Sequence, residues 1–326
     1  MERTLSGIKP TGPMTLGRYL GAVRHWVEDQ PEGEAFYFIA DLHALTTEQA
    51  PGAVVKRTLE LATLLLAVGI DPTRGSVVFI QSHVPQHAEM CFLLECSTSF
   101  GELRRMTQFK DKSGEQDFVS AGLFSYPVLM AVDILLYDIA RVPVGDDQRQ
   151  HLELTRTIAQ RFNSRYGPTF VLPEAVIPPV AARVRDLQDP TRKMSASSDS
   201  GAGVIDILDP LDGVVRKIRR AVTDTEAEVR YDPEAKPGVS NLLEILGACT
   251  GEKAGDLAGK YDTYGALKND CAEAVVEVLR PIQQRYWELG EEGVMKTILR
   301  DGAAHATELA EAKLRLAKNN IGLYRP

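Results

Sequence analysis

The chain has 326 residues, 44% hydrophobic and 25% charged, which is an ordinary composition for a soluble globular protein and enough length for one large domain plus a smaller one. Its net charge of −8 excludes a general electrostatic attraction to nucleic acid, so such binding must use a local basic patch. The four cysteines form no CxxC pair or zinc spacing, no signal peptide is visible, and the longest apolar run is too short to span a bilayer. We therefore expect a soluble cytoplasmic protein that makes no membrane contact.

The N-terminal stretch has the pattern of a strand, a turn and a helix. Residues 3–8 predict a strand, and the prolines and glycine in residues 9–13 exclude a helix there. Thr15 is a candidate N-cap for a helix with apolar residues at helical spacing as far as Val27. Such a helix N-terminus can offer N–H groups to phosphate oxygens, although many βα turns share this pattern.

Short apolar strands alternate with helices over the first half of the chain. Strands are predicted at residues 35–40, 75–81 and 139–144, and helices at 52–68, 88–95, 100–112, 120–137 and from Gln148 through Arg161. The alternation indicates a parallel, doubly wound α/β sheet that binds ligands at the carboxyl ends of its strands. The polar clusters at residues 12–17, 41–43 and 145–148 and around Lys193 can therefore converge on one crevice.

The pattern changes at about Leu208. Helices are predicted at residues 211–222, 241–246, 264–287 and 294–317, and no strand is predicted after Ile207. We expect a second, mostly helical domain, joined through residues 182–235. Its first helix has a basic patch that is either a nucleic-acid contact or a solvated helix face, formed by Arg216, Lys217, Arg219 and Arg220.

Residues 190–200 are rich in serine around Lys193, and Met194 is almost their only apolar side chain. Ser and Asp side chains compete for local hydrogen bonds, so regular structure is not expected. The stretch is either a solvated surface loop or a mobile loop that brings Lys193 and several N–H and O–H donors onto a polyphosphate.

Many sequence blocks, in one order along nearly the whole chain, resemble the motifs of bacterial tryptophanyl-tRNA synthetases, a family of class I aminoacyl-tRNA synthetases. Residues 6–18 (Ser-Gly-Ile-Lys-Pro-Thr-Gly through Thr-Leu-Gly-Arg) stand where the family has its counterpart of HIGH, and residues 193–197 (Lys-Met-Ser-Ala-Ser) stand where it has KMSKS. The other matching blocks are residues 106–110, 126–133, 142–148, 151–156, 221–224, 236–243 and 279–282.

The resemblance implies a Rossmann-type catalytic domain with a parallel sheet at residues 1–185, and a KMSKS-type loop with the return to that domain at 186–207. It implies a helical anticodon-binding domain at 208–326, whose C-terminal part can pack back on the catalytic domain. It further implies a homodimer that activates L-tryptophan with ATP and Mg2+, releases pyrophosphate and charges tRNA(Trp). Such chemistry depends on positioning and on stabilising the charge of the phosphates.

The resemblance also implies roles for individual residues. Those expected to contact ATP are Lys9, Pro10, Thr11, Gly17, Arg18, Gly145, Asp146, Asp147, Val184, Lys193, Met194, Ser195, Ala196 and Ser197. Those expected in the tryptophan pocket are Leu5, Gly7, His43, Gln108, Tyr126, Met130, Asp133, Val142 and Val144. The expected catalytic residues are Thr15, Arg18, Lys193 and Ser195. No protein-held metal is expected, since Mg2+ arrives with ATP.

Asp133 is the residue expected to set substrate identity. It is an acid in an otherwise apolar predicted helix, where a carboxylate needs a partner. An indole N–H only donates, so a carboxylate in an apolar pocket recognises indole in preference to a phenyl ring. The alternative is a structural carboxylate that pairs with an arginine or a helix cap.

Several positions depart from the family pattern. Arg18 stands where the family usually has asparagine, Lys9 where it has glutamine, and Ala196 where it has the second lysine of KMSKS. We hypothesise that Lys9 and Arg18 offset this missing lysine at the triphosphate. Leu5, where an aromatic residue is common, can admit substituted indoles.

Two alternative functions remain open. One is a tyrosyl-type enzyme, which Asp133 disfavours. The other is a divergent paralogue that binds tryptophan or a substituted tryptophan, charges tRNA weakly and has an auxiliary partner-binding role.

Overall fold

Parallel strands form the centre of the molecule, which has a Rossmann-type α/β fold. The computed structural model describes residues 3–28, 30, 34–107, 109, 119–143, 148–176, 183–195 and 201–324. The main sheet has the order β1 (Thr4–Ile8), β2 (Ala35–Ile39) and β3 (Ser76–Ile80). A second parallel pair, β4 (Arg141–Pro143) and β5 (Glu174–Val176), contacts it where β4 meets β1.

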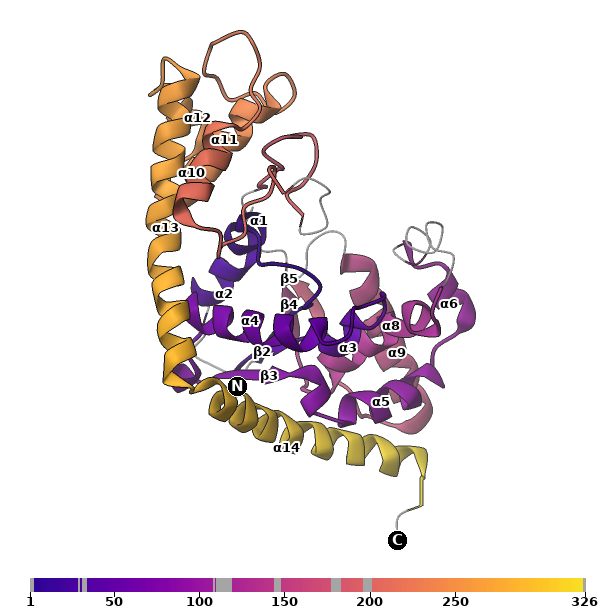
Figure 1. The fold of residues 1–326 in the computed structure, drawn as a ribbon. Coiled ribbons are helices and arrows are strands. Elements are labelled where there is room, and N and C mark those ends of the chain that lie inside the picture. The colour runs from indigo at the N-terminus through magenta and orange to yellow at the C-terminus, as the bar shows by residue number, and fades with distance from the viewer. Residues whose placement is uncertain are drawn as a thin grey trace.

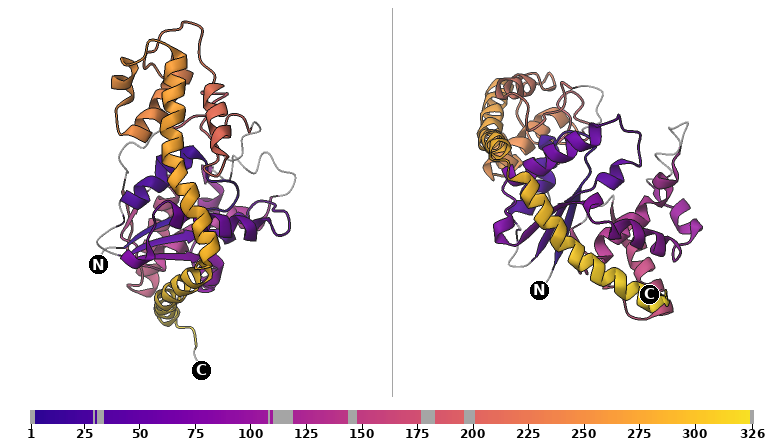
Figure 2. Two further views of the ribbon diagram at one scale, coloured as in Figure 1. Left: turned by 60° about the vertical axis from the view of Figure 1, so that its left-hand side comes forward. Right: turned by 60° about the horizontal axis from the view of Figure 1, so that its bottom comes forward.

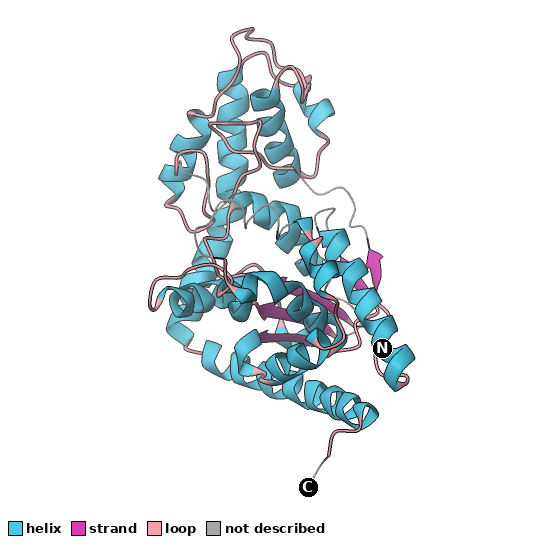
Figure 3. Cartoon of the chain, turned by 90° about the vertical axis from the view of Figure 1, so that its right-hand side faces the viewer, coloured by secondary structure: helices cyan, strands magenta, loops and turns pink. Residues whose placement is uncertain are grey.

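Helices surround these strands on both faces (Figure 3). Up to residue 166 they are α1 (Leu16–Arg18), the π-helical η1 (Tyr19–Val23), α2 (Arg24–Glu28), α3 (Asp41–Ala44), α4 (Ala53–Ala67), the 3-10 segments η2 (Pro72–Arg74) and η3 (Gln81–His83), α5 (Gln86–Glu95), α6 (Phe100–Arg104), α8 (Ala121–Leu135) and α9 (Arg149–Tyr166). The later helices are α10 (Leu211–Arg219), α11 (Pro237–Thr250), α12 (Ala254–Ala258), α13 (Tyr264–Glu292) and α14 (Met295–Ile321).

Strand β2 separates two hydrophobic cores, and all of its residues are buried. Tyr37 and Ile39 lie in the core shared with α4, α10, α11 and α13. Phe36 and Phe38 lie in the core shared with α5, α8, α9 and α14. Successive side chains of a strand point to opposite faces, so a wholly apolar strand such as β2 belongs in a parallel sheet that is covered on both sides.

The helical region is organised on the long helix α13. Helices α10 and α11 pack on one end of it, and α4 packs near its other end (Figure 1). The chain leaves α13 at Gly293, whose φ of 67° is readily adopted by glycine. Helix α14 then runs back across β3 and α5 (Figure 2).

Helix α14 packs directly on the backbone of β3. A Cβ atom at Gly302 would lie 2.0 Å from the carbonyl oxygen of Val78, so no larger residue fits there. Two polar contacts fix the helix on either side, since His305 Nε2 lies 2.9 Å from Glu34 Oε1 and Lys313 Nζ lies 2.6 Å from Asp138 Oδ1. The helix thereby covers a strand that would otherwise be an open sheet edge.

The prediction of a Rossmann-type α/β fold is confirmed, while several element ends differ from the prediction. The helix expected at 100–112 ends as α6 at Arg104, and residues 108 and 110–118 lie outside the described part. The helix expected at 211–222 ends at Arg219, and the one expected at 241–246 is the middle of the longer α11. Strand β5 and helix α12 were not expected from the sequence. Within the described residues, no helix has the length and apolar character needed to cross a membrane.

Candidate active site

The carboxyl ends of the three central strands bring several polar side chains together. Ile8, Ile39 and Ile80 are aligned at this edge of the sheet. Lys9 follows the first of these strands, and its Nζ donates to Thr46 Oγ1 at 3.0 Å. Thr46 Oγ1 in turn donates to the carbonyl oxygen of His43 at 2.8 Å. The turn after β1 and the segment after β2 therefore meet, as expected for ligand sites in such sheets.

The turn after β1 leads into helix α1, and Thr15 is its N-cap. The buried Thr15 Oγ1 accepts a hydrogen bond from the backbone N–H of Arg18 at 3.2 Å. The backbone N–H of Leu16 donates to the carbonyl oxygen of Ile205 at 2.8 Å. This contact joins the start of α1 to the segment that follows the Ser-rich loop. In the turn itself, Pro10 is buried and Thr11 is exposed.

Gly17 allows the loop segment of residues 183–195 to lie directly on α1. A Cβ atom at Gly17 would be 3.3 Å from Met194 Cβ and 3.4 Å from Val184 Cβ. Both neighbours are buried, and the N–H of Met194 donates to the carbonyl oxygen of Val184 at 3.2 Å. Gly17, Val184 and Met194, all expected at the ATP site, are therefore in contact in the structure.

Lys193 and Ser195 flank Met194 and are exposed. Lys193 forms an isolated bridge with the backbone of Arg185, while its ammonium group has no polar partner in the described part of the chain. Asp186 supports the preceding turn, because its Oδ1 accepts from the backbone N–H groups of Gln188 and Asp189 at 2.8 and 3.1 Å. The segment thus presents a free cation beside the start of α1.

Arg18 is a second cation at this place. Burial lowers the pKa of its guanidinium, and no side chain among the described residues forms an ion pair or hydrogen bond with it. A partly buried guanidinium without an acidic partner is costly to the protein alone. An anionic ligand beside Thr15 and Gly17 would remove that cost.

Asp133 lies in helix α8 and is only 2% exposed. Its Oδ2 is 2.8 Å from His43 Nε2, and its Oδ1 accepts from Gln81 Nε2 at 2.7 Å. His87 Nδ1 also lies 2.8 Å from Oδ1, although the ring does not direct an N–H along this line. The carboxylate pairs with histidine and glutamine, and neither the arginine nor the cap considered from the sequence is its partner.

Asp133 remains a carboxylate in spite of its burial. Burial by itself would raise the pKa of this group, but the charges and hydrogen bonds of His43 and His87 outweigh it, and the net direction is downward. An ionised acceptor is therefore available among the buried apolar residues of α8.

The other residues expected in the tryptophan pocket and described by the structure lie in the same part of the fold. The Tyr126 ring meets His43 edge-on at 6.2 Å, its hydroxyl lies 2.7 Å from His151 Nε2, and burial raises its pKa to about 12. Leu5 and Val142 are buried in the core of α5 and α8, and Met130 is half-buried. A Cβ atom at Gly7 would lie 2.6 Å from the Phe38 ring, so glycine lets that ring pack against β1.

Several expected site residues lie outside the described residues. They are Gln108 and Val144 of the tryptophan pocket and Gly145, Asp146, Asp147, Ala196 and Ser197 of the ATP site. Their assignment stays a prediction from the sequence.

Two residues of the Asp133 cluster were missed in the sequence. Gln81 and His87 are each 0% exposed. Gln81 directly follows β3, and Asp41 stands close after β2 in the same way. A polar residue at the carboxyl end of an apolar strand is a signal of a ligand site, and this signal was available for Gln81. His87 had no such signal, because a lone histidine in a helix is usually structural.

The basic helix α10 is largely engaged within the protein. Arg216 pairs with Asp212, and Lys217 Nζ donates to Asp209 Oδ2 at 2.7 Å. Arg219 Nε donates to Asn269 Oδ1 at 3.0 Å. These contacts favour the reading of a solvated helix face for Arg216 and Lys217.

The chain is similar to known proteins over almost its whole length. The family model of class I tRNA synthetases (W and Y) matches residues 2–280. Tryptophan–tRNA ligase 1 of Streptomyces avermitilis is 52% identical to this chain, covering 99% of both. The tryptophanyl-tRNA synthetase structure from Mycoplasma pneumoniae is 38% identical, with a TM-score of 0.90 and coverage of 99% and 98%. The Campylobacter jejuni enzyme, solved with ADP and tryptophan, is 36% identical, with a TM-score of 0.84 and coverage of 98% and 100%.

The match extends through the turn after β1, the cluster around Asp133 and the segment of Lys193, and it includes most of the helical region. This chain therefore belongs to the class I tRNA synthetases of the tryptophan and tyrosine (W and Y) family.

Proposed function

We propose that this chain is a cytoplasmic tryptophan–tRNA ligase. It activates L-tryptophan with ATP to tryptophanyl-adenylate and pyrophosphate, and then transfers the tryptophanyl group to tRNA(Trp). The observation that carries the proposal is the buried, ionised Asp133 at the carboxyl edge of the sheet, in a chain 52% identical to a tryptophan–tRNA ligase.

The proposed reaction consists of two successive displacement steps. A carboxylate oxygen of tryptophan attacks the α-phosphorus of ATP, the bond to the β-phosphate breaks, and pyrophosphate leaves. A hydroxyl of the terminal ribose of tRNA then attacks the acyl carbon, AMP leaves, and the ribose proton is lost to solvent. Neither step needs covalent help from the protein, so positioning and charge stabilisation dominate.

ATP would lie where α1 and the segment of residues 183–195 meet. The absence of a side chain at Gly17 allows close packing against Met194. Arg18 and Lys193, the neighbours of these two residues in sequence, have no ion-pair partner among the described residues. Lys9 is held near the first strand by Thr46. We propose that Lys9 and Arg18 compensate at the triphosphate for the alanine at position 196, with Mg2+ bound to the ATP phosphates.

Asp133 would accept the indole N–H of the substrate. A carboxylate has about four lone-pair sites, and the three contacts described here leave capacity on Oδ2. Tyr126 and the apolar side chains of Leu5, Met130 and Val142 would enclose the ring, with Gly7 and His43 beside them.

We also propose that the enzyme is a homodimer with residues 208–326 as its anticodon-binding part. Phe92 of α5 and Phe100 of α6 are 66% and 68% exposed, and exposed aromatic side chains of this kind are enriched in protein–protein interfaces. Light scattering tests this directly. A mass of about twice 35.8 kDa is expected, and a monomer at micromolar concentration would contradict the dimer.

The activity is tested in two stages with the purified chain. Tryptophan-dependent exchange of pyrophosphate into ATP reports activation, and acylation of tRNA(Trp) reports transfer. Both are expected. Exchange without acylation would support the divergent paralogue with an auxiliary role, a tyrosine requirement would support tyrosyl-type charging, and absence of both activities would overturn the enzyme assignment.

A further inference from the structure

Two buried side chains that were not expected in the tryptophan pocket contact the carboxylate of Asp133. Gln81 comes from η3 and His87 from α5, so both elements that follow β3 converge on the same carboxylate. Both contacts are to Oδ1, whereas the partly exposed His43 contacts Oδ2. The two oxygens therefore have different partners: Oδ1 contacts the fully buried Gln81 and His87, and Oδ2 contacts His43, whose side chain is 13% exposed.

The Gln81 side chain lowers the stability of the folded protein at this position. It is fully buried, and its Oε1 has no hydrogen-bond partner among the residues that the structure describes. A buried amide with an unsatisfied oxygen destabilises a protein relative to an apolar side chain of the same shape. Among the described residues, the only hydrogen bond of the Gln81 side chain is the 2.7 Å donation from Nε2 to Asp133 Oδ1. A functional role of this side chain would therefore use that contact.

His87 is itself held in place. Its Nε2 lies 2.8 Å from the hydroxyl of Tyr137, a side chain that is 0% exposed. Burial raises the pKa of Tyr137, so its hydroxyl stays protonated and can donate to Nε2. In that tautomer Nδ1 carries the ring proton and lies 2.8 Å from Asp133 Oδ1, so the contact is electrostatic and not an aligned hydrogen bond.

We propose that Gln81 and His87 are positioning residues for tryptophan recognition, which fix Oδ1 of Asp133 and keep Oδ2 as an ionised acceptor for the indole N–H. The inference rests on the proposed function. It predicts that loss of either residue weakens the recognition of the indole N–H by Asp133. The other contacts of the indole ring are preserved. A purely structural role would weaken every substrate alike.

The test compares tryptophan with β-(3-benzothienyl)alanine, in which sulfur replaces the N–H. Pyrophosphate exchange is measured with both amino acids for the wild type and for Gln81→Met. We expect kcat/KM for tryptophan to fall about tenfold more than kcat/KM for the analogue. Equal losses with both amino acids would overturn the positioning role of Gln81.

Gln30→Met is the matched control. Gln30 is also a buried glutamine, but its side-chain amide group forms hydrogen bonds away from the carboxyl edge of the sheet. Its partners are Val27, Gly69, Asp71 and Ser76. We expect this variant to leave the ratio of the two substrates unchanged. A wild type that shows no tryptophan-dependent exchange would instead remove the proposed function, which is a different outcome from an altered ratio.

His87→Phe provides a second test should Gln81→Met fail to fold. The groups facing Asp133 that titrate are His43 from α3, His87 and Cys91 from α5, and Tyr137 after α8. Without His87 the Asp133 carboxylate loses a lowering influence, so it protonates at higher pH. We expect kcat/KM for tryptophan to gain an acid limb that is absent with the analogue. Identical pH profiles for the two amino acids would contradict the proposal.

Discussion

Gly17 and Met194 are 177 positions apart in the chain, yet a side-chain carbon at Gly17 would touch the Cβ of Met194 at 3.3 Å. The first belongs to the helix that begins after β1, and the second to the Ser-rich stretch of residues 190–200. Because the two surfaces are already in contact, the start of α1 and this segment act as one wall of the proposed ATP site. Small changes at Gly17 should therefore affect ATP more than tryptophan.

The first prediction concerns that contact. In Gly17→Ala, Met194 and Val184 must move by a few tenths of an ångström. We expect KM for ATP to rise several-fold, by roughly 1 kcal/mol of lost binding, while KM for tryptophan stays within twofold. Exchange kinetics at varied ATP measure this. Gly255→Ala is the control, since no atom lies within 4 Å of a Cβ there. Equal changes of KM for ATP in the two variants would contradict the role of Gly17 and Met194 as one wall of the ATP site.

Arg18 supplies the second prediction. Its guanidinium has no acidic partner in the described residues, so it is free to bind an anion. In Arg18→Asn we expect kcat for exchange to fall about 100-fold, the loss typical of one preorganised donor to a transition-state charge. The exposed Arg74 in η2 serves as the control in Arg74→Asn. Unchanged ATP kinetics in Arg18→Asn would show that the cations have not been redistributed to this residue.

Some parts of this site could be predicted from sequence and others could not. Thr15 was predictable as an N-cap because its hydroxyl precedes an apolar helix, and the strands were predictable because β2 and β3 are wholly or mostly apolar. Strand β5 was not, since its three residues are mostly exposed and carry no alternation. The pairing of Gln81 and His87 with Asp133 was not predictable, because both residues stand about fifty positions earlier in the chain. The position of Gln81 after an apolar strand marked it only as a polar residue at the sheet edge.

The third prediction concerns the packing of α14 on the sheet. In Gly302→Ala the new methyl group would collide with the carbonyl of Val78, and neither backbone can move cheaply. We expect the free energy of unfolding to fall by about 1–3 kcal/mol. Gly290 in α13 has open space around it, so Gly290→Ala should raise stability by up to ~1 kcal/mol. Urea unfolding of both variants measures these changes. Equal stability of Gly302→Ala and Gly290→Ala would contradict the close approach of α14 to the backbone of Val78.

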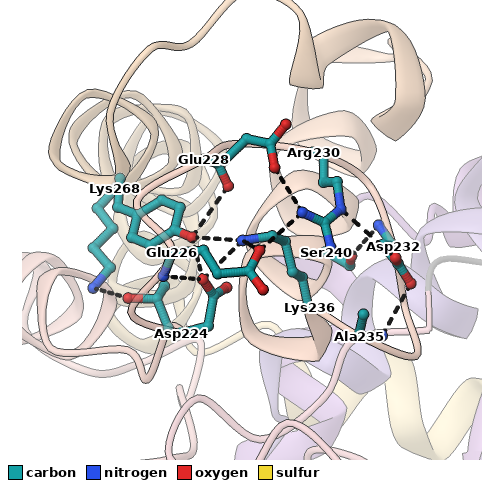
Figure 4. A network of polar contacts seen from close by, with 11 residues as sticks. Asp224, Glu226, Glu228, Arg230, Asp232, Ala235, Lys236, Ser240 and Lys268 are labelled. Atoms are coloured by element: carbon teal, nitrogen blue, oxygen red, sulfur yellow. Dashed lines mark hydrogen bonds and ion pairs between the residues drawn. The ribbon is translucent and has the colours of Figure 1, made fainter.

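The fourth prediction concerns a polar cluster in the helical region (Figure 4). The buried Lys236 donates to Asp224 Oδ1 at 2.8 Å and to the Tyr264 hydroxyl at 3.0 Å. Burial by itself would lower the pKa of Lys236, but these contacts and Glu226 outweigh it and raise the pKa. For Asp224 burial acts upward, but the hydrogen bonds from Lys236 and Tyr264 prevail and hold the pKa at about 2.

The sign of the pH effect follows from this carboxyl group. Its pKa is lower in the folded chain than the value of about 4 in the unfolded chain, so the stabilisation is present above pH ~4 and is lost between about pH 4 and 2. We expect wild-type stability in urea to fall more steeply over this range than that of Asp224→Asn. The exposed Asp262→Asn variant should follow the wild type. Parallel pH profiles for all three proteins would contradict the role of the cluster.

Tryptophan-dependent exchange of pyrophosphate into ATP, measured for the wild type beside Asp133→Asn, tests the central claim most directly. The account predicts exchange that requires tryptophan and is not supported by tyrosine. It also predicts a fall of about 100-fold in kcat/KM for tryptophan in Asp133→Asn, because the substrate N–H then loses a charged acceptor. Exchange that prefers tyrosine, or an Asp133→Asn enzyme that activates tryptophan as well as the wild type, would contradict it.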